Sequence, residues 1–116
     1  MLNIASSAGL RGYAYVSAYC ASKHALVGYT RAAALELGPK GVAFGALCPH
    51  YVDSPMLEAS IRNVVEKTGM STDEARAHFA GQNPSGELVT PEQVAKAAAD
   101  WFERPENGAI VELTGA

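Results

Sequence analysis

The stretch VAFGALCP, residues 42–49, is a continuous apolar run with Gly41 in front of it and Pro49 at its end. A strand buried on both faces of a parallel sheet has this composition, because helices cover both of its sides. Residues 42–49 therefore predict an inner strand of a parallel sheet.

The chain before this strand predicts a long helix. Residues 17–37 are rich in alanine and leucine and contain no proline, and their apolar positions recur at helical spacing. We expect the helix to end at Gly38 and Pro39, because glycine can take the left-handed cap and proline cannot continue the helix. The apolar positions are Ala25, Leu26, Tyr29, Ala32, Ala33 and Leu37.

The remaining segments predict further elements of an α/β fold. Apolar runs at 2–5 and 108–113 indicate strands, the first of them buried and followed by a loop of small residues. The order β-α-β-α-α-α-β implies a parallel sheet with helices packed on its faces, in a single domain that spans residues 1–116. Start signals for helices predict three of them, over 55–67, 71–81 and 90–104.

Composition and charge argue against several functions. The net charge of -3 comes without a basic patch, so we expect no nucleic acid and no membrane as a partner. The first residues, MLNIASSAGLRG, lack a basic segment followed by a long apolar run, and we therefore expect a cytoplasmic protein. Cys20 and Cys48 match no disulfide scaffold and are expected to be reduced.

The segment SAYCASKHAL, residues 17–26, places a tyrosine four residues before a lysine. This spacing puts Tyr19 and Lys23 on one helix face, one turn apart. A nearby ammonium favours the phenolate form of a tyrosine and prepares it for proton transfer. Ser6 follows the first strand, at the edge where open α/β sheets bind ligands, and can donate a hydrogen bond to the same substrate oxygen. The plain alternative is a half-packed tyrosine beside a solvated lysine.

Together these residues resemble the signature of the short-chain dehydrogenase/reductase family, Y-x-x-x-K with a serine thirteen residues upstream. Y-C-A-S-K occupies residues 19–23, and Ser6 stands thirteen residues before Tyr19. The segment N-I-A-S-S-A-G-L (3–10) is similar to the family's strand and serine loop, in which the position of the glycine selects Ser6 over Ser7. C-P-H-Y-V-D-S-P-M (48–56) resembles the segment after the next strand, usually Pro-Gly followed by a threonine or serine.

The resemblance implies the C-terminal half of a doubly wound, Rossmann-like parallel sheet with flanking helices. It also implies an oxidoreductase that uses NAD or NADP to interconvert a secondary alcohol and a ketone. Tyr19 would be the acid/base group, Lys23 would bind the nicotinamide ribose, and Ser6 would hold the substrate oxygen. The nicotinamide itself would meet Pro49, the backbone of Val52 and the hydroxyl of Ser54.

Departures from the family pattern carry expectations of their own. His50 stands where the family has glycine, and we expect its side chain to crowd the nicotinamide or to bend the loop. Gly45 takes the place of a common asparagine. The family's glycine-rich phosphate loop has no counterpart in residues 1–116. We therefore expect this chain to be the catalytic half of an enzyme, without the N-terminal half that binds the dinucleotide phosphates, and to be inactive alone. The residues that choose between NAD and NADP are expected in that other half.

A zinc-binding module is one alternative. Cys20 and His24 lie one helical turn apart, and Cys48 and His50 alternate onto one side of a strand end, so the four side chains would suit a tetrahedral site. Ordinary burial of the cysteines in the core is the simpler interpretation.

An oligomerisation fragment without catalysis is another alternative. The alanine-rich face of the long helix, with Ala25, Ala32 and Ala33, is expected to form a homodimer or homotetramer, as this helix does in the family. Alternatively, the same helix face packs on the sheet of its own chain.

The segment 57–88 resembles the family's variable lid over the substrate. Its apolar character suggests a medium-sized 3-oxoacyl or 3-hydroxyacyl substrate, whereas plain packing of two helices on the body would explain it equally well. The apolar candidates are Met56, Leu57, Ile61, Val64 and Phe79.

Overall fold

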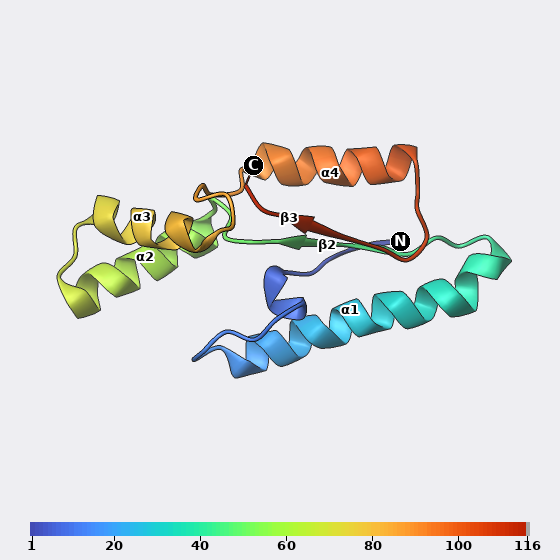
Figure 1. Cartoon of the computed structure of the whole chain (residues 1–116), viewed down its shortest axis with the longest axis horizontal. Helices are drawn as coiled ribbons and strands as arrows, with labels where there is room; N and C mark the ends of the chain where they lie inside the picture. The colour runs from blue at the N-terminus through green and yellow to red at the C-terminus, as the bar shows by residue number, and fades with distance from the viewer. Residues whose placement is uncertain (116) are drawn as a thin grey trace.

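Parallel strands and their flanking helices make up the computed structural model, which describes residues 1–115. Within those residues the sheet order is β1 (Leu2–Ile4), β2 (Gly45–Pro49) and β3 (Ala109–Leu113). Figure 1 shows α1 (Ser17–Leu37) on one face of the sheet, α4 (Pro91–Glu103) on the other, and both α2 (Pro55–Thr68) and α3 (Thr72–Gln82) beyond the carboxyl ends of the strands. The predicted order of elements and the α/β fold class are confirmed. Two short 3₁₀ helices, η1 (Ser7–Gly9) and η2 (Gly38–Lys40), complete the chain.

The central strand β2 is buried along its whole length, as its composition predicts. It pairs in parallel with β1 on one side and β3 on the other. The strand begins three residues later than predicted, because Val42 still belongs to the preceding turn, where its N–H donates to the Leu37 carbonyl at 3.1 Å. Residues 42–44 therefore connect the helix to the sheet.

The first strand lies at an edge of the sheet within the described residues, and the burial predicted from its apolar run is incomplete there. β1 pairs only with β2 among the described strands, and Ile4 is 49% exposed. A run of apolar residues is compatible with either place, because sequence does not specify how many neighbours a strand has.

Helix α1 has the predicted bounds, but its buried face differs in part from the predicted apolar positions. Val27, Thr30 and Ala34 are buried against the sheet side, whereas Ala25 and Ala32 are exposed. Thr30 is accommodated because its hydroxyl accepts a hydrogen bond from the Asn3 side chain at 2.9 Å. Alanine occurs on both faces of α1, so its spacing does not separate the inner face from the outer one.

The end of α1 differs from the prediction of a left-handed cap at Gly38. Gly38 keeps right-handed backbone angles, the turn tightens into η2, and Gly41 takes the left-handed conformation with a φ of 88°. Pro39 fits the first turn of η2, where its missing N–H is not needed. The left-handed residue that ends the helical segment is therefore Gly41, one short turn after Gly38.

The three later helices begin where their N-caps predict. The hydroxyls of Ser54, Ser71 and Thr90 each accept a hydrogen bond from the backbone N–H three residues on. Leu57, Ile61 and Ala75 join α2 and α3 in a buried cluster that is separate from the core beneath α1. We call this pair of helices the α2–α3 unit.

The glycine at position 45 has a local cause. A Cβ atom there would lie 2.5 Å from Nε1 of Trp101, the buried side chain by which α4 covers β2. Asparagine, the residue common at this place in the related pattern, would require the indole to move. Glycine at position 45 therefore leaves the space that the Trp101 indole occupies.

Cys20 and Cys48 are free thiols, and both are buried. Among residues 1–115, no helix is both long enough and apolar enough to cross a bilayer.

Candidate active site

A cavity of about 700 Å³ lies at the carboxyl ends of the strands, between the start of α1 and the α2–α3 unit. Open α/β sheets bind ligands at this edge. Each residue that the sequence singled out for catalysis or cofactor binding contributes to its wall. They are Ser6, Tyr19, Lys23, Pro49, Val52 and Ser54.

Tyr19 and Lys23 project from adjacent turns of α1, as their spacing predicts. The Lys23 ammonium nitrogen lies 5.6 Å from the centroid of the Tyr19 ring and donates a hydrogen bond to the Ile4 carbonyl at 3.3 Å. Tyr19 is 42% exposed, so its phenol is open to the cavity. The ammonium therefore sits between the phenol and the end of β1.

Ser6 and Ser7 have different surroundings, although they are neighbours in sequence. Ser6 is the N-cap of η1, and its Oγ accepts a hydrogen bond from the Ala8 N–H at 3.1 Å. Its hydroxyl hydrogen is left to donate into the cavity. Ser7 is buried, and its Oγ accepts a hydrogen bond from the Tyr13 hydroxyl at 3.0 Å.

Gly9 fixes the distance between the serine loop and α1. A Cβ atom on Gly9 would lie 2.8 Å from both the Lys23 carbonyl oxygen and Cγ2 of Val27. η1 therefore packs directly on the turn of α1 that carries Lys23. The sequence pattern used this glycine only to choose between two serines, whereas the structure gives it a packing role.

The segment after β2 forms the wall opposite the serine loop. Val52 forms a parallel bridge with Val89, in which the Asp53 N–H donates to the Val89 carbonyl and the Val89 N–H donates to the Tyr51 carbonyl. The N–H and C=O of Val52 itself consequently point away from Val89. The Ser54 hydroxyl lines the cavity while accepting a hydrogen bond from the Leu57 N–H at 3.3 Å.

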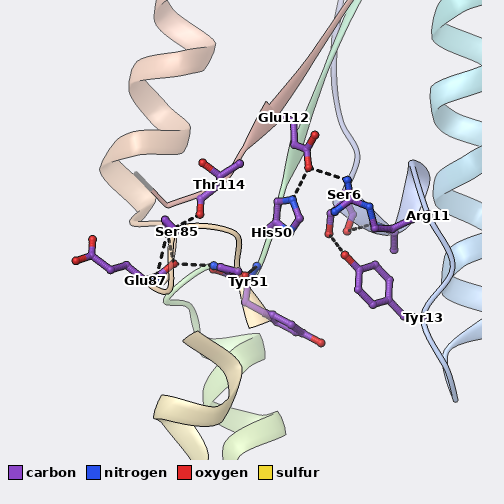
Figure 2. Close-up of polar contacts among 12 residues, drawn as sticks. Ser6, Arg11, Tyr13, His50, Tyr51, Ser85, Glu87, Glu112 and Thr114 are labelled. Carbon is purple, nitrogen blue, oxygen red and sulfur yellow. Dashed lines mark hydrogen bonds and ion pairs between the residues drawn. The ribbon is translucent and has the colours of Figure 1, made fainter. Parts of the chain in front are cut away.

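His50 is held by a network that the sequence did not reveal. Figure 2 shows Glu112 of β3 bonded to both His50 and Arg11. Its Oε1 lies 2.6 Å from Nε2 of His50 and 3.0 Å from the Arg11 guanidinium. The hydrogen bond from His50, reinforced by Arg11, holds the pKa of Glu112 below its ordinary value.

His50 also has a structural contact that the family pattern does not imply. Its side chain is buried and turned toward Glu112, and its backbone does not have the positive φ that would favour glycine. The residue anchors the end of β2 to β3, and because it also lines the cavity, its crowding of the nicotinamide stays a prediction. A single acid within the apolar strand GAIVEL was the signal that could have pointed to Glu112.

The four side chains of the zinc alternative have separate environments. Cys48 packs in the core with Ala5 and Val27, and burial raises the pKa of its thiol. His24 Nδ1 lies 2.8 Å from the Cys20 carbonyl, while His50 is bonded to Glu112. Within residues 1–115, no three His, Cys, Asp or Glu side chains are grouped as metal ligands would be.

Aromatic side chains that the sequence analysis missed complete the cavity. Tyr13 and Tyr51 both line it, and the Tyr51 ring packs edge-on against Phe79 with centroids 5.1 Å apart. Of the predicted lid residues, Leu57 and Ile61 are buried between α2 and α3. The segment predicted as a lid thus packs on itself and also lines the cavity.

Comparison with known proteins agrees with this geometry. Residues 1–64 match the family model described as short chain dehydrogenase. The chain is 34% identical to D-beta-hydroxybutyrate dehydrogenase of Cupriavidus necator, across 99% of this chain and 46% of that protein. It is 36% identical to a putative ketoacyl reductase of Streptomyces coelicolor, across 85% of this chain and 38% of that protein.

Solved structures give the same result. Actinorhodin polyketide ketoreductase, an F189W variant solved with NADPH, superposes with a TM-score of 0.86 at 32% identity, covering 98% of this chain and 45% of that one. Levodione reductase superposes with a TM-score of 0.85 at 30% identity, covering 98% and 44%. The chain therefore spans less than half the length of each of these proteins.

Proposed function

The chain belongs to the short-chain dehydrogenase family, and on this premise we propose that it is the proton-transfer half of an NAD(P)-dependent oxidoreductase. The enzyme interconverts a secondary alcohol and a ketone. The observation that carries the proposal is the meeting of Ser6, Tyr19 and Lys23 on one cavity wall at the ligand-binding edge of the sheet.

In this mechanism the side chains of the chain bind the substrate oxygen and transfer one proton to or from it. The Ser6 hydroxyl donates a hydrogen bond to the substrate oxygen and stabilises the charge that develops there. During reduction Tyr19 gives its proton to that oxygen, and during oxidation its phenolate takes the proton back. Lys23, one turn away, stabilises the phenolate electrostatically. The nicotinamide supplies or accepts the hydride when it is bound.

The residues present suit the nicotinamide end of NAD or NADP. The Lys23 ammonium has donors to spare beyond its bond to Ile4, and it lies where ribose hydroxyls would be held. The outward-facing backbone of Val52 and the Ser54 hydroxyl suit a carboxamide, with Pro49 as the adjoining wall. We assign the phosphate end of the dinucleotide to a half of the enzyme outside residues 1–116.

Substrate size and self-association extend the proposal. The substrate is a medium-sized 3-oxoacyl or 3-hydroxyacyl compound, a choice that the putative ketoacyl reductase among the relatives supports. We place the enzyme in the cytoplasm, as a homodimer or homotetramer formed through the outer face of α1, where Tyr29 is 54% and Leu35 is 81% exposed. Light scattering over a range of concentrations tests the association, and a monomer throughout would exclude it.

The two adjacent serines provide the test of the function. The completed enzyme is this chain joined to the amino-terminal half of a family member. In it, Ser6→Ala is expected to lower turnover by about 10²-fold or more, because a donor to the reacting oxygen is lost. Ser7→Ala is the matched control and should keep most turnover, since the Ser7 side chain is buried against Tyr13. Loss of turnover in Ser7→Ala with retention in Ser6→Ala would refute the assignment, and the chain alone should bind either dinucleotide only weakly.

A further inference from the structure

We propose that Glu112 is a positioning residue for the proton transfer, because its carboxylate holds Arg11 and His50 at once and so sets the distance between two walls of the cavity. The proposal rests on the proposed function, since it concerns the same reaction. Glu112 is not among the described residues that line the cavity. It therefore acts through the two segments that it joins, the serine loop and the segment that follows β2.

Glu112 occupies a place in the sheet where an apolar side chain is usual. It pairs in register with Cys48 of β2, and Cys48 packs with Ala5 and Val27 beneath α1. Residues paired across two strands have their side chains on the same face of the sheet. Glu112 therefore lies on the face that α1 covers, where a carboxylate is unfavourable unless it has partners. Its partners, and not packing, account for an acid at this place.

The contact with Arg11 joins parts of the fold that the strand pairing leaves apart. β1 and β3 are not neighbours, because β2 lies between them, and two strand spacings separate them by about 10 Å. Arg11 follows η1, the short helix that Ser6 caps, and its backbone N–H donates to the Ser7 carbonyl at 3.1 Å. Its guanidinium lies 3.0 Å from the Glu112 carboxylate. The serine loop is thereby tied to β3 across the end of β2.

The contact with His50 ties the opposite wall to the same carboxylate, as Figure 2 shows. The His50 backbone N–H donates to the Leu113 carbonyl at 2.9 Å, and its Nε2 lies 2.6 Å from Oε1 of Glu112. A carboxylate at this distance keeps a hydrogen on Nε2 and fixes the orientation of the imidazole. The His50 side chain is 3% exposed and lines the cavity. A fixed ring therefore gives this wall a fixed shape, two residues before Val52.

The expected consequence is larger for the reaction than for the fold. The side chains of Arg11 and Glu112 are 48% and 35% exposed, and ion pairs as exposed as these contribute little to stability. A displacement of about 1 Å at a catalytic site, in contrast, can lower the rate by about 10²-fold. A looser contact would therefore change the position of Ser6 relative to the opposite wall, and with it the rate, more than the free energy of unfolding.

The other ion pairs among the described residues do not join the two walls. Arg76 holds Asp53 and Glu58 on the side of the α2–α3 unit. Lys96 holds Asp100 on the exposed side of α4, at 2.8 Å. The Lys96–Asp100 pair therefore offers a control, because it has the same kind of charges away from the cavity.

NMR of the chain itself tests the link without any need for turnover. Arg11→Met removes the contact on one wall and should change the ring nitrogen signals of His50 on the other wall, because both side chains share Glu112. In a Glu112→Gln background the same substitution should change those signals much less. Asp100→Asn, which breaks the exposed pair on α4, should leave them unchanged. Unchanged His50 signals in Arg11→Met, or equal changes in both backgrounds, would overturn the proposal.

The same variants in the completed enzyme measure the effect on the reaction. Glu112→Gln should lower kcat by about tenfold or more, because the spacing of the walls is relaxed, whereas Asp100→Asn should keep kcat. In an enzyme that carries Arg11→Met, Glu112→Gln should lower kcat by a smaller factor, since one contact is already missing. Normal kcat in Glu112→Gln contradicts the inference, and so does an equal loss in the two backgrounds. An enzyme that needs Tyr19 but tolerates Glu112→Gln would defeat this inference alone.

Discussion

The region of α1 and the sheet is held together differently from the α2–α3 unit, although both face the same cavity. In the first region, backbones approach closely at Gly9 and a partly buried side-chain hydrogen bond joins Asn3 to Thr30. The α2–α3 unit lies beyond the strand ends (Figure 1) and is held by its own cluster around Leu57 and Ile61. The difference suggests that the proton-transfer groups are fixed by a rigid frame, while the substrate wall can vary without disturbing them.

One side chain joins the two regions. Asn83, at the end of α3, is buried and accepts a hydrogen bond from the Tyr51 N–H at 2.9 Å. Its amide nitrogen donates to the Tyr51 carbonyl at 3.0 Å and to the Glu87 carbonyl at 2.8 Å. The α2–α3 unit is thereby tied to the segment that follows β2.

The largest expected effect separates the two regions directly. Ile61→Ala should destabilise the protein by about 2 to 5 kcal/mol, because it removes a fully buried side chain from the α2–α3 cluster. Hydrogen exchange should accelerate in α2 and α3 and much less in α1. Val27→Ala, in the core beneath α1, is the counterpart and should accelerate exchange across the sheet. Equal acceleration of α1 in both variants would mean that the two regions unfold as one.

A smaller effect tests the rigid frame. Gly9→Ala should lower the free energy of unfolding by about 1 to 3 kcal/mol, because its Cβ would press on the Lys23 carbonyl and on Val27. Gly28→Ala on α1 is the matched control. No atom lies within 4 Å of a Cβ there, and alanine favours a helix by up to about 1 kcal/mol. Urea denaturation of both variants measures the contrast, and a neutral Gly9→Ala would show that the loop has room to move.

The smallest effect concerns pH. The pKa of Glu112 is depressed in the fold by His50 and Arg11, so its contribution to stability is complete above its ordinary pKa and is lost as the pH falls through the folded value. Glu112→Gln should remove that contribution, which is no more than about 1 kcal/mol because Glu112 and Arg11 are partly exposed. Urea denaturation at about pH 7 and about pH 3 should show variant and parent converging in acid. The same difference in the free energy of unfolding at both pH values would show that the effect does not come from the charge of Glu112.

The sequence predicted those features whose causes are local. Residues 42–49 indicated a buried strand because every position is apolar, and Ser54 indicated a helix start because an N-cap acts on the next turn. Tyr19 and Lys23 could be paired because both lie on one helix. The meeting of Ser6 with them followed from the resemblance and the sheet edge.

Features that depend on distant contacts were not predictable in this way. Glu112 lies 62 residues from His50 and 101 residues from Arg11, and no local pattern joins them. The outer position of Ala25 depends on which surface of α1 the neighbouring elements cover. Tyr13 and Tyr51 converge on the cavity only after both segments have folded.

Replacement of one phenol tests the central claim most directly. In the completed enzyme, Tyr19→Phe should lower turnover by about 10²- to 10⁴-fold with the fold intact, because it removes the group that transfers the proton. Tyr29→Phe removes a hydroxyl from the same helix at an exposed side chain outside the cavity, and should keep normal turnover. Steady-state kinetics followed by the absorbance of the reduced nicotinamide measures both. Near-normal turnover in Tyr19→Phe would contradict the assignment of proton transfer to this chain.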